Sequence, residues 1–499
     1  MSDTTVLLPD ATLASPDATP GADCVVVRGD SISDVGGREE LLQRWTGARL
    51  VELPGCLLMP GMVNAHQHGR GISQVQLGYQ DDFLEAWISS RRGRGTLDPY
   101  PITKLAAVNM LVHGVTTTVH ANYSYGTGDY EAEIRASLRA YDEAGIRVTM
   151  CVGAMDRGFT VYPPHETCFL TALPNELQNW LSHPGVQLYA GSAEDTIALM
   201  NRLQSDYAGH PRIRLCYGPA GPQWVSDELW SKLARDADQH GLGLHLHALE
   251  SPAQAAAASE LYPGGVLQHL KRLGVMNERA TIAHGVWVTD RDIDLIAETG
   301  TTVVRNPGCN LRLRNGIAPL ARYLARGARV AIGTDNAALA DDEDVLKELR
   351  LAALLARTPD WNGDPPPSTG QLFAMLTVNG ARAAQLAPDI GIIAPGKKAD
   401  LVAVDLARVR EPYLDPDMPL ADAVLARANG RDVRMTMVDG HVVFRDGMVA
   451  GVDRSELERQ AAAAALRARL PQELENRARS LALKQHLVSH YRAKAQLDL

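Results

Sequence analysis

Side chains that can bind a metal ion recur at the ends of short apolar runs along this chain. His66 and His68 stand two residues apart after one run, His247 follows another with Glu250 three residues on, and Asp335 follows a third. His284 is a further single histidine, without such a clear run before it. A parallel barrel brings the carboxyl ends of all its strands to one rim. The repetition therefore favours a barrel with one shared site at that rim.

The middle of the chain alternates short apolar runs with helix-like segments. This alternation is typical of a parallel α/β sheet, and so many repeats favour a closed (β/α)8 TIM barrel over an open sheet. The expected strands are 114–119, 146–151, 213–217, 243–247, 280–284, 301–304 and 329–333, with helices at 227–240, 290–299 and 344–357 among them.

Both ends of the chain have a different texture, with short strands separated by turns. Strands are expected at 23–27 and 49–53, and again at 399–405, 435–438 and 441–444. We interpret the two ends as one small composite β-sandwich domain with the barrel inserted. The predicted boundaries are 1–59 and 393–452 for this domain, 60–392 for the barrel and 453–499 for a helical tail.

The bulk composition describes an ordinary globular enzyme-sized protein. The net charge of −10 argues against a nucleic-acid partner, which would require a basic patch. Six scattered cysteines without a CxxC pair favour a reducing compartment over a disulfide framework. The sequence offers neither a signal peptide nor an apolar run of membrane-spanning length. We therefore expect a cytoplasmic protein with no membrane partner.

The residues that precede His66 make the first histidine pair specific. Read together with that pair, the run 57–64 resembles the amidohydrolase superfamily, in its deaminase-like branch of methylthioadenosine/S-adenosylhomocysteine deaminases and triazine hydrolases. The similarity continues in order along the chain, at 114–118, at His247 with Glu250, and at 306–311, 315–319, 333–335 and 396–401.

The resemblance implies a metal site held by His66, His68, His247 and Asp335. Imidazoles and one carboxylate suit a divalent ion, Zn²⁺ first, with Fe²⁺, Mn²⁺ or Co²⁺ as alternatives. His245 would point the same way as His247 on a strand and could replace it, but only His247 has Glu250 at the family's spacing. One ion is preferred over two, because the expected fourth strand, 213–217, lacks the lysine or glutamate that bridges binuclear members.

The same resemblance implies the catalytic roles. A bound divalent ion lowers the pKa of water from about 15.7 towards roughly 7, which provides hydroxide as the nucleophile. Glu250 is expected to take the proton from water and return it to the substrate or leaving group. His284 is expected near the nucleophile, and Asp335 is expected to orient or deprotonate the water in addition to binding the metal.

Substrate-binding residues are less constrained by the sequence. Arg70 and Arg305 could meet an anionic substrate group, Trp87 could pack on a planar ring and His120 could line the pocket; each could equally be a packing residue. Ala220 stands where nucleoside deaminases commonly carry a histidine, which argues against their most familiar substrate. The acidic run 341–344 is expected to be a solvated loop with a helix cap.

The sequence thus predicts an aminohydrolase that cleaves a C–N bond of a small nitrogen heterocycle. The alternative is the same site expelling chloride, hydrosulfide or an amine, or opening a cyclic amide. A binding barrel without catalysis would have lost a ligand or the acid/base, whereas all the expected side chains are present. We also expect a homo-oligomer, a dimer or a tetramer.

Overall fold

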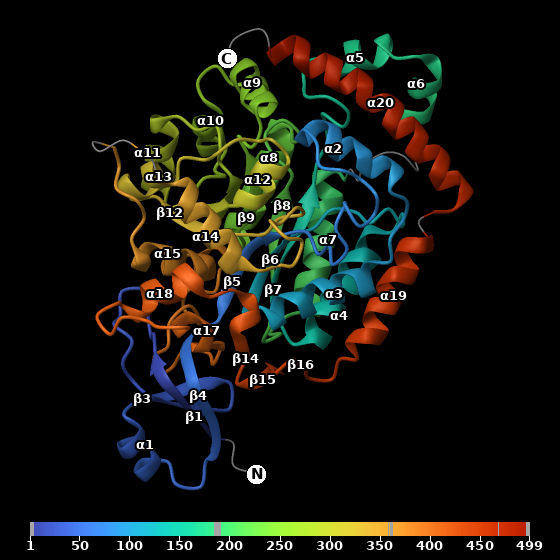
Figure 1. The fold of residues 1–499 in the computed structure, drawn as a ribbon. Helices are drawn as coiled ribbons and strands as arrows, with labels where there is room; N and C mark the ends of the chain where they lie inside the picture. Colours follow the sequence, from blue (N-terminus) through green and yellow to red (C-terminus); the bar gives the residue numbers. More distant parts are fainter. Residues whose placement is uncertain (1–3, 184–190, 358, 360–362, 468, 496–499) are drawn as a thin grey trace.

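Eight parallel strands close into a barrel in the computed structural model, which describes residues 4–183, 191–357, 359, 363–467 and 469–495 (Figure 1). Each strand pairs in parallel with the next one along the chain, so the predicted TIM barrel is confirmed. In chain order the strands are β5 (Met62–Gln67), β6 (Val115–Ala121), β7 (Arg147–Ala154), β8 (Ile213–Pro219), β9 (Leu244–Ala248), β10 (Ala280–His284), β11 (Thr302–Arg305) and β12 (Arg329–Ile332).

The barrel closes between its last strand and its first. Just beyond β12, the backbone N–H groups of Thr334 and Asp335 donate to the carbonyl oxygen of His66, at 3.1 and 2.9 Å. The closing hydrogen bonds are therefore made by residues of the candidate site itself. β8 is the fourth strand of the barrel, as expected, and it contains no lysine or glutamate.

Helices occupy the connections between the barrel strands. One of them, α8 (Asp227–His240), shows why they form: the Ser226 side chain accepts from the backbone N–H of Leu229, and Gly241 ends the helix with a φ of 66°. The other connecting helices are α3 (Pro99–Val112), α4 (Tyr130–Ala144), α5 (Glu166–Ala172), α6 (Asn175–Leu181), α7 (Ala193–Asp206), α9 (Pro252–Leu261), α10 (Val266–Arg272), α11 (Asp290–Thr299), α12 (Pro307–Arg312) and α13 (Leu320–Ala325), followed after β12 by α14 (Val345–Leu355), α15 (Thr369–Leu376) and α16 (Val378–Ala383).

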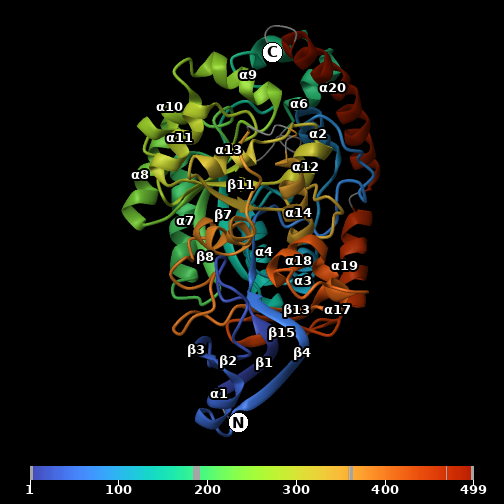
Figure 2. The ribbon, with the colours of Figure 1, turned by 60° about the vertical axis from the view of Figure 1, so that its left-hand side comes forward.

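The two ends of the chain build a second sheet, in the order β16-β15-β14-β13-β4-β1-β2-β3 within the described residues. The antiparallel pairing of β13 with β4, from Leu401 opposite Pro60 to Asp405 opposite Cys56, joins the two halves. The composite β-domain is thus confirmed, and it lies at one end of the barrel (Figure 2). Its strands are β1 (Thr4–Thr12), β2 (Cys24–Arg28), β3 (Ser31–Gly36), β4 (Arg49–Pro60), β13 (Leu401–Asp405), β14 (Val433–Val438), β15 (His441–Arg445) and β16 (Met448–Val449), with the short helices α1 (Arg38–Arg44), α17 (Ala407–Arg410), α18 (Leu420–Arg427) and η3 (Gly430–Asp432) beside them.

A buried ion-pair cluster fastens this β-domain to the amino end of the barrel. Nε of Arg147, at the start of β7, lies 2.7 Å from a carboxylate oxygen of Asp400, and its Nη2 lies 2.5 Å from Asp439. The same guanidinium donates to the carbonyl oxygen of Pro211 at 2.7 Å. All three charged side chains are buried, and each has its partner within the cluster.

Two other segments lie against the barrel near its carboxyl end. The loop after β5 carries α2 (Leu84–Ser90) and the short η1 (Arg91–Gly93). The residues after the β-domain form α19 (Arg454–Arg467), which packs on α3, and α20 (Pro471–Ala495), which lies along α2, η1, α6 and α9 (Figure 1). Among the described residues, every helix is too short or too polar to serve as a membrane span.

Candidate metal centre and cavity

Side chains from four strand ends converge on one point at the carboxyl end of the barrel. His66 and His68 come from the end of β5, His247 from β9 and His284 from the end of β10, while Asp335 follows β12. Oδ1 of Asp335 lies 3.1 Å from Nε2 of His68 and 3.6 Å from Nε2 of His66, and its Oδ2 lies 3.5 Å from Nε2 of His284. All of these side chains are buried.

The donor atoms are arranged as a divalent metal ion requires. The ligand atoms of His66, His68 and His247 lie within 4.8 Å of one another, and so do those of His66, His284 and Asp335. Nε2 of His66 and Nε2 of His284 are buried without a hydrogen-bond partner among the described residues. Because buried polar atoms are normally paired, these two unpaired nitrogens are explained by a metal ion as their partner. Imidazoles with one carboxylate fit a divalent ion of the zinc type.

The outer ring nitrogens of the candidate ligands are held by the surrounding protein. Nδ1 of His68 donates to the carbonyl oxygen of Ala121 at 2.6 Å, and Nδ1 of His247 lies 3.1 Å both from the carbonyl oxygen of Ala220 and from the hydroxyl of Tyr123. A partner on the outer nitrogen fixes the ring and turns the inner nitrogen toward the ion. Ala220 therefore acts through its backbone at the place where a histidine was the expected family residue.

His245 lies behind the candidate ligands. Its Nε2 is 2.7 Å from Nδ1 of His66, and its Nδ1 is 2.5 Å from the hydroxyl of Thr281. Both of its nitrogens are thus used away from the centre. This geometry favours His247 over His245 as the ligand from β9, and gives His245 the part of orienting His66.

Burial sets the protonation of the cluster. Desolvation lowers the pKa of His68 and of His284 to about 4, and lowers the pKa of His247 well below its usual value. Burial alone would raise the pKa of Asp335, but the hydrogen bonds from His66 and His68 outweigh it and hold that pKa well below 3.8. At neutral pH the rings of His68, His247 and His284 are thus neutral and the Asp335 carboxylate is ionised, the forms that bind metal.

Glu250 lies beside the cluster with its carboxylate directed to it. Oε1 of Glu250 is 3.6 Å from Nε2 of His284 and accepts from the Nδ2 amide of Asn315 at 2.9 Å. Its Oε2 accepts from Nε2 of Gln254 at 3.3 Å. Burial, followed by the nearby charge of Asp335, raises the pKa of Glu250 well above its usual value. A carboxyl held by two side-chain amides beside a metal-ligand cluster is placed to take up a proton and pass it on.

Three residues at these strand ends have a left-handed backbone although none is glycine. The φ angles are 52° for Leu249, 75° for His284 and 56° for Asp335. Such conformations cost about 1–3 kcal/mol each and concentrate at functional sites, where they turn a side chain to a required direction. Two of these residues, His284 and Asp335, carry converging side chains, and the third, Leu249, immediately precedes Glu250.

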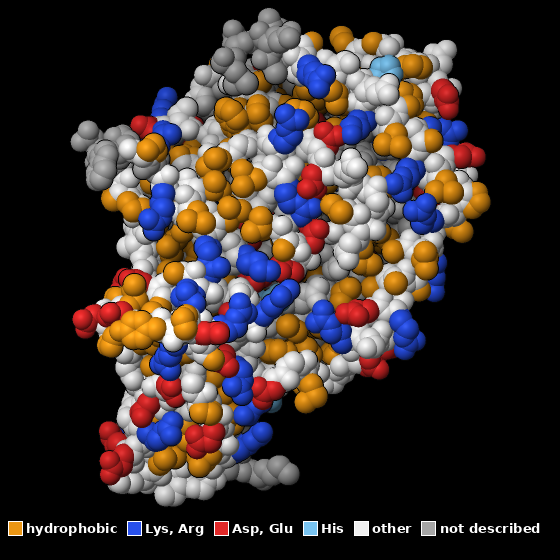
Figure 3. Space-filling view, viewed as in Figure 1, with side chains coloured by type: hydrophobic (Ala, Val, Ile, Leu, Met, Phe, Trp, Pro, Cys, Tyr) orange, Lys and Arg blue, Asp and Glu red, His pale blue; other side chains and the backbone are white. Residues whose placement is uncertain are grey.

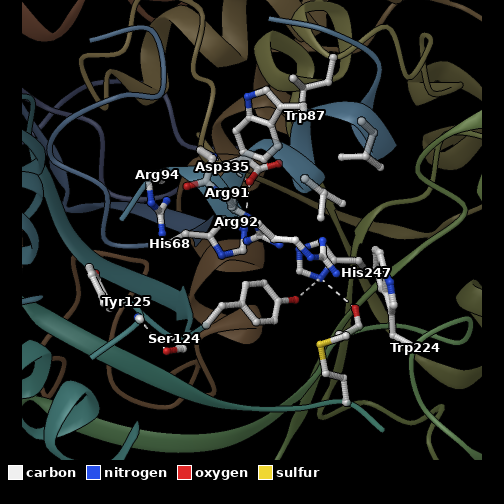
Figure 4. A pocket seen from close by; sticks show the side chains of 18 of the residues that line it. His68, Trp87, Arg91, Arg92, Arg94, Ser124, Tyr125, Trp224, His247 and Asp335 are labelled. Carbon is white, nitrogen blue, oxygen red and sulfur yellow. Dashed lines mark hydrogen bonds and ion pairs between the residues drawn. The ribbon is translucent and has the colours of Figure 1, made fainter. Parts of the chain in front are cut away.

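A cavity opens beside the cluster, and aromatic side chains line it (Figure 4). Trp87, on α2, is buried and lines this cavity, while its contact with substrate stays a prediction. Tyr123, Trp224, Met155 and Ala220 line it as well. Flat apolar walls around a few converging polar groups are typical of a site for a small planar molecule.

Three of the predicted substrate-binding residues lie elsewhere. His120 is buried and its Nδ1 is 2.9 Å from the hydroxyl of Tyr141. Arg305 is buried as well, and the guanidinium of Arg70 lies 3.8 Å above the ring of Tyr125. None of the three is among the described side chains that line the cavity, so we do not assign them direct substrate contacts.

Other cavity residues were not expected from the sequence. Arg91, Arg92 and Arg94 line the cavity from η1 and the residue after it. Glu473 and Asn476 reach it from α20. The run Arg91-Arg92-Gly93-Arg94 is visible in the sequence as a concentration of positive charge, but only the tertiary structure places it beside the metal centre.

The prediction for the acidic run 341–344 is correct for the helix cap and wrong for Glu343. Asp344 caps α14, accepting from two of its backbone N–H groups. Glu343 is instead only 7% exposed and accepts hydrogen bonds from Asn64 and from the hydroxyl of Thr334. Burial raises the pKa of Glu343 to about 8. This carboxyl therefore supports the backbone just before Asp335.

The similarity to known proteins extends over most of the chain. Residues 57–443 match the model of the amidohydrolase family. A 5-methylthioadenosine/S-adenosylhomocysteine deaminase of Nitratidesulfovibrio vulgaris is 30% identical over 87% of this chain and 90% of its own. Among solved structures, an adenosine deaminase from Xanthomonas campestris with bound zinc has a TM-score of 0.79 at 25% identity, with 93% of this chain and 98% of that chain covered.

A triazine hydrolase from Arthrobacter aurescens shares the fold, with a TM-score of 0.77 at 22% identity, over 93% of this chain and all of that chain. Fold, ligand cluster and family match therefore agree with one another. The chain belongs to the amidohydrolase family, as a metal-dependent hydrolase that acts on non-peptide C–N bonds.

Proposed function

We propose that this enzyme removes an amino group from a small nitrogen heterocycle, with one divalent ion, preferably Zn²⁺, held by His66, His68, His247 and Asp335. The observation that carries the proposal is the convergence of these four side chains beside Glu250, whose pKa burial raises. A proton carrier next to a metal centre is the combination that hydrolytic deamination requires.

The ion, when bound, would lower the pKa of a water molecule and so supply a nucleophile at neutral pH. Zn²⁺ is preferred because imidazole nitrogens and carboxylate oxygens are the donors that catalytic zinc sites use. The zinc-bound adenosine deaminase among the structural relatives supports the same preference.

Glu250 is the proposed proton carrier. Its carboxyl would take up the proton that the attacking water loses and return it to the departing nitrogen. The amide of Asn315 and the side chain of Gln254 hold the two carboxyl oxygens in place for this transfer. The raised pKa of Glu250 supports this role, because the proton is held more tightly than by an exposed carboxylate.

His284 is the proposed stabiliser of the attacked ring. Its Nε2 lies between the carboxylates of Asp335 and Glu250, at 3.5 and 3.6 Å, and its Nδ1 is 2.9 Å from Oδ1 of Asn310. With the outer nitrogen held by Asn310, the inner nitrogen is directed at the place where negative charge develops. Trp87 would cover the flat face of the heterocycle.

The leaving group is the feature that a direct experiment can decide. Purified enzyme loaded with Zn²⁺ is incubated with sets of heterocycles that share one ring and differ only in an amino, chloro or thio substituent. We expect release of ammonia from amino members, measured with a coupled glutamate dehydrogenase assay. Release of chloride or sulfide without ammonia would favour the alternative hydrolase, and the shared ring makes each set its own control.

The assembly state remains a prediction, a homodimer or homotetramer. Light scattering coupled to size-exclusion chromatography measures it directly, and a monomeric mass would contradict it.

A further inference from the structure

Four arginines lie together on one side of the cavity, with no carboxylate within 4.0 Å of them among the described residues. They are Arg70, Arg91, Arg92 and Arg94, and the last three line the cavity itself (Figure 4). Arg94 is only 7% exposed. A buried charge without a partner is costly, so such a group needs an explanation.

The hydrogen bonds of these arginines divide them into two pairs. Nη2 of Arg92 donates to the carbonyl oxygen of Phe159 at 2.6 Å, and Nη2 of Arg70 reaches that of Tyr123 at 3.5 Å. The side chains of Arg91 and Arg94 have no hydrogen-bond acceptor among the described residues, and the Nε of each is buried. Nε of Arg92 is also buried without an acceptor, but Arg91 and Arg94 are the two cavity-lining guanidinium groups that make no side-chain hydrogen bond to the described residues.

Buried arginines elsewhere in the molecule behave differently. Arg147 pairs with Asp400 and Asp439 at the amino end of the barrel, and Arg312 pairs with Asp81 and Asp341.

Arg305 also lacks a carboxylate, but it does not line the cavity. Arg91 and Arg94 are thus distinguished by lining the cavity with neither a carboxylate partner nor a side-chain hydrogen bond to the described residues. Glu473 lines the cavity from α20, yet none of its carboxylate oxygens lies within ion-pair distance of the described arginines.

The cavity is consequently rich in positive charge. Burial and then the neighbouring guanidinium groups lower the pKa of Arg91 to about 10 and that of Arg94 well below its usual value. Arg91 nevertheless remains charged at neutral pH. The outer face seen in Figure 3 intersperses basic and acidic side chains, whereas three arginines gather on the η1 side of this cavity, and its carboxylates, Glu473, Glu250 and Asp335, form no ion pair with them. Clustered charges of one sign at a cleft attract a ligand of the opposite charge.

Tyr123 connects the arginines to the metal centre. The guanidinium of Arg91 lies 5.7 Å from the centre of the Tyr123 ring, and the hydroxyl of the same ring is 3.1 Å from Nδ1 of His247. The charged groups and the ligand cluster are therefore about one aromatic side chain apart. A heterocycle with one substituent spans such a distance.

We propose that the substrate carries an oxyanion, a carboxylate or a phosphate, that Arg91 and Arg94 bind while its ring lies at the metal centre. Planar guanidinium groups match both oxyanions in geometry. Arg70 and Arg92 add positive charge but keep their backbone contacts. The inference deepens the proposed deamination and rests on it for the position of the ring.

Binding of matched neutral and anionic probes tests this inference without turnover. The zinc-loaded Glu250→Gln variant is titrated calorimetrically with adenosine and adenosine 5′-monophosphate, and with pterin and pterin-6-carboxylate. We expect the anionic member of at least one pair to bind about 10- to 100-fold more tightly than the neutral member, the range for a charge-assisted hydrogen bond. The first pair reports on phosphate and the second on carboxylate.

Arg91→Met and Arg94→Met in the same background should abolish this preference and leave the affinity for the neutral member unchanged. Arg91→Lys should restore part of it. Arg202→Met, at an exposed ion pair on α7, removes the same charge far from the cavity and should have no effect. Equal affinities within both pairs, a preference that survives Arg91→Met, or no binding of either anionic probe at millimolar concentration would overturn the inference.

Ammonia release by the wild-type enzyme is scored separately. Arginine-dependent anion binding without ammonia release would retain the anion site and contradict the proposed deamination. Ammonia release from neutral heterocycles alone, with no anion preference, would support the proposed deamination and contradict the anion site.

Discussion

The two ends of the barrel treat their arginines in opposite ways. At the amino end, Arg147 lies between Asp400 and Asp439, and the cluster joins the barrel to the β-domain. At the carboxyl end, Arg91 and Arg94 face a cavity and have no carboxylate partner among the described residues. Ion pairing at one end contributes to holding the fold together, whereas unpaired charge at the other end is available to a ligand. The usual division of a TIM barrel into a stabilising and a catalytic face thus extends here to single guanidinium groups.

Removing the metal should have the largest effect, and it should act on the carboxyl end alone. Dialysis against a chelator is expected to reduce ammonia release to background, because His66, His68, His247 and Asp335 would lose the ion that activates water. Adding back one equivalent of Zn²⁺ should restore activity, as measured by metal analysis and the ammonia assay together. Full activity in demonstrably metal-free protein would contradict the metal centre.

Replacing the proton carrier should follow in size. Glu250→Gln is expected to lower kcat by about 10²–10⁴-fold, the usual contribution of a general acid or base, with an unchanged metal content. Glu228→Gln on the exposed side of α8 makes the same chemical change without a role at the site and serves as the control. Wild-type kcat in the Glu250 variant would remove this residue from the mechanism.

Matched substitutions at the two ends test the comparison directly. Arg147→Met should lower the free energy of unfolding by about 3–5 kcal/mol, because it leaves Asp400 and Asp439 buried without a counter-charge. Arg91→Met should change it by less than about 1 kcal/mol or stabilise the fold, since the charge it removes is unpaired. Urea titration at neutral pH measures both. Similar losses for both variants would mean that the two ends do not differ as described.

Replacing Glu343 should have the smallest effect, a change in the free energy of unfolding that depends on pH. Its pKa is raised from 4.5 to about 8 by burial, so the folded state binds its proton more tightly than the unfolded state. This contribution to stability is complete below pH 4.5 and is lost as the pH rises through 8. Glu343→Gln cannot lose a proton and should therefore become more stable than wild type by roughly 1–3 kcal/mol between pH 5 and pH 8. A pH-independent difference in melting temperature would contradict this.

Much of the metal centre can be predicted from the sequence, because strand geometry determines where the side chains at the strand ends lie. His66 and His68 alternate onto one side of β5, and parallel strands bring His247, His284 and Asp335 to the same rim. Local phrases at strand ends, together with the family resemblance that selects His247 over His245, therefore name the converging side chains. The composite β-domain can be predicted in the same way, because the short strands expected at each end of the chain have only those of the other end to pair with.

Several residue roles could not be predicted from the sequence, because they depend on which contacts the folded chain makes or lacks. Arg91 and Arg94 matter because no carboxylate reaches them, and a lack of partners has no local sequence signal. Ala220 contributes its carbonyl oxygen to His247, which any residue type would supply. Glu343 reads as part of an acidic surface run, yet Asn64 and Thr334 draw it into the interior. In each case tertiary surroundings, not residue type, decide the role.

The pairing of β4 with β13 also determines the order in which the protein can mature. The ribosome completes β4 before the barrel and β13 after it, and translation at about 5–20 residues per second makes this interval tens of seconds. During that time the edge of β4 that later pairs with β13 exposes free backbone N–H and C=O groups, which can pair with other chains. Co-expression with a holding chaperone should therefore raise the yield of folded enzyme by protecting this edge.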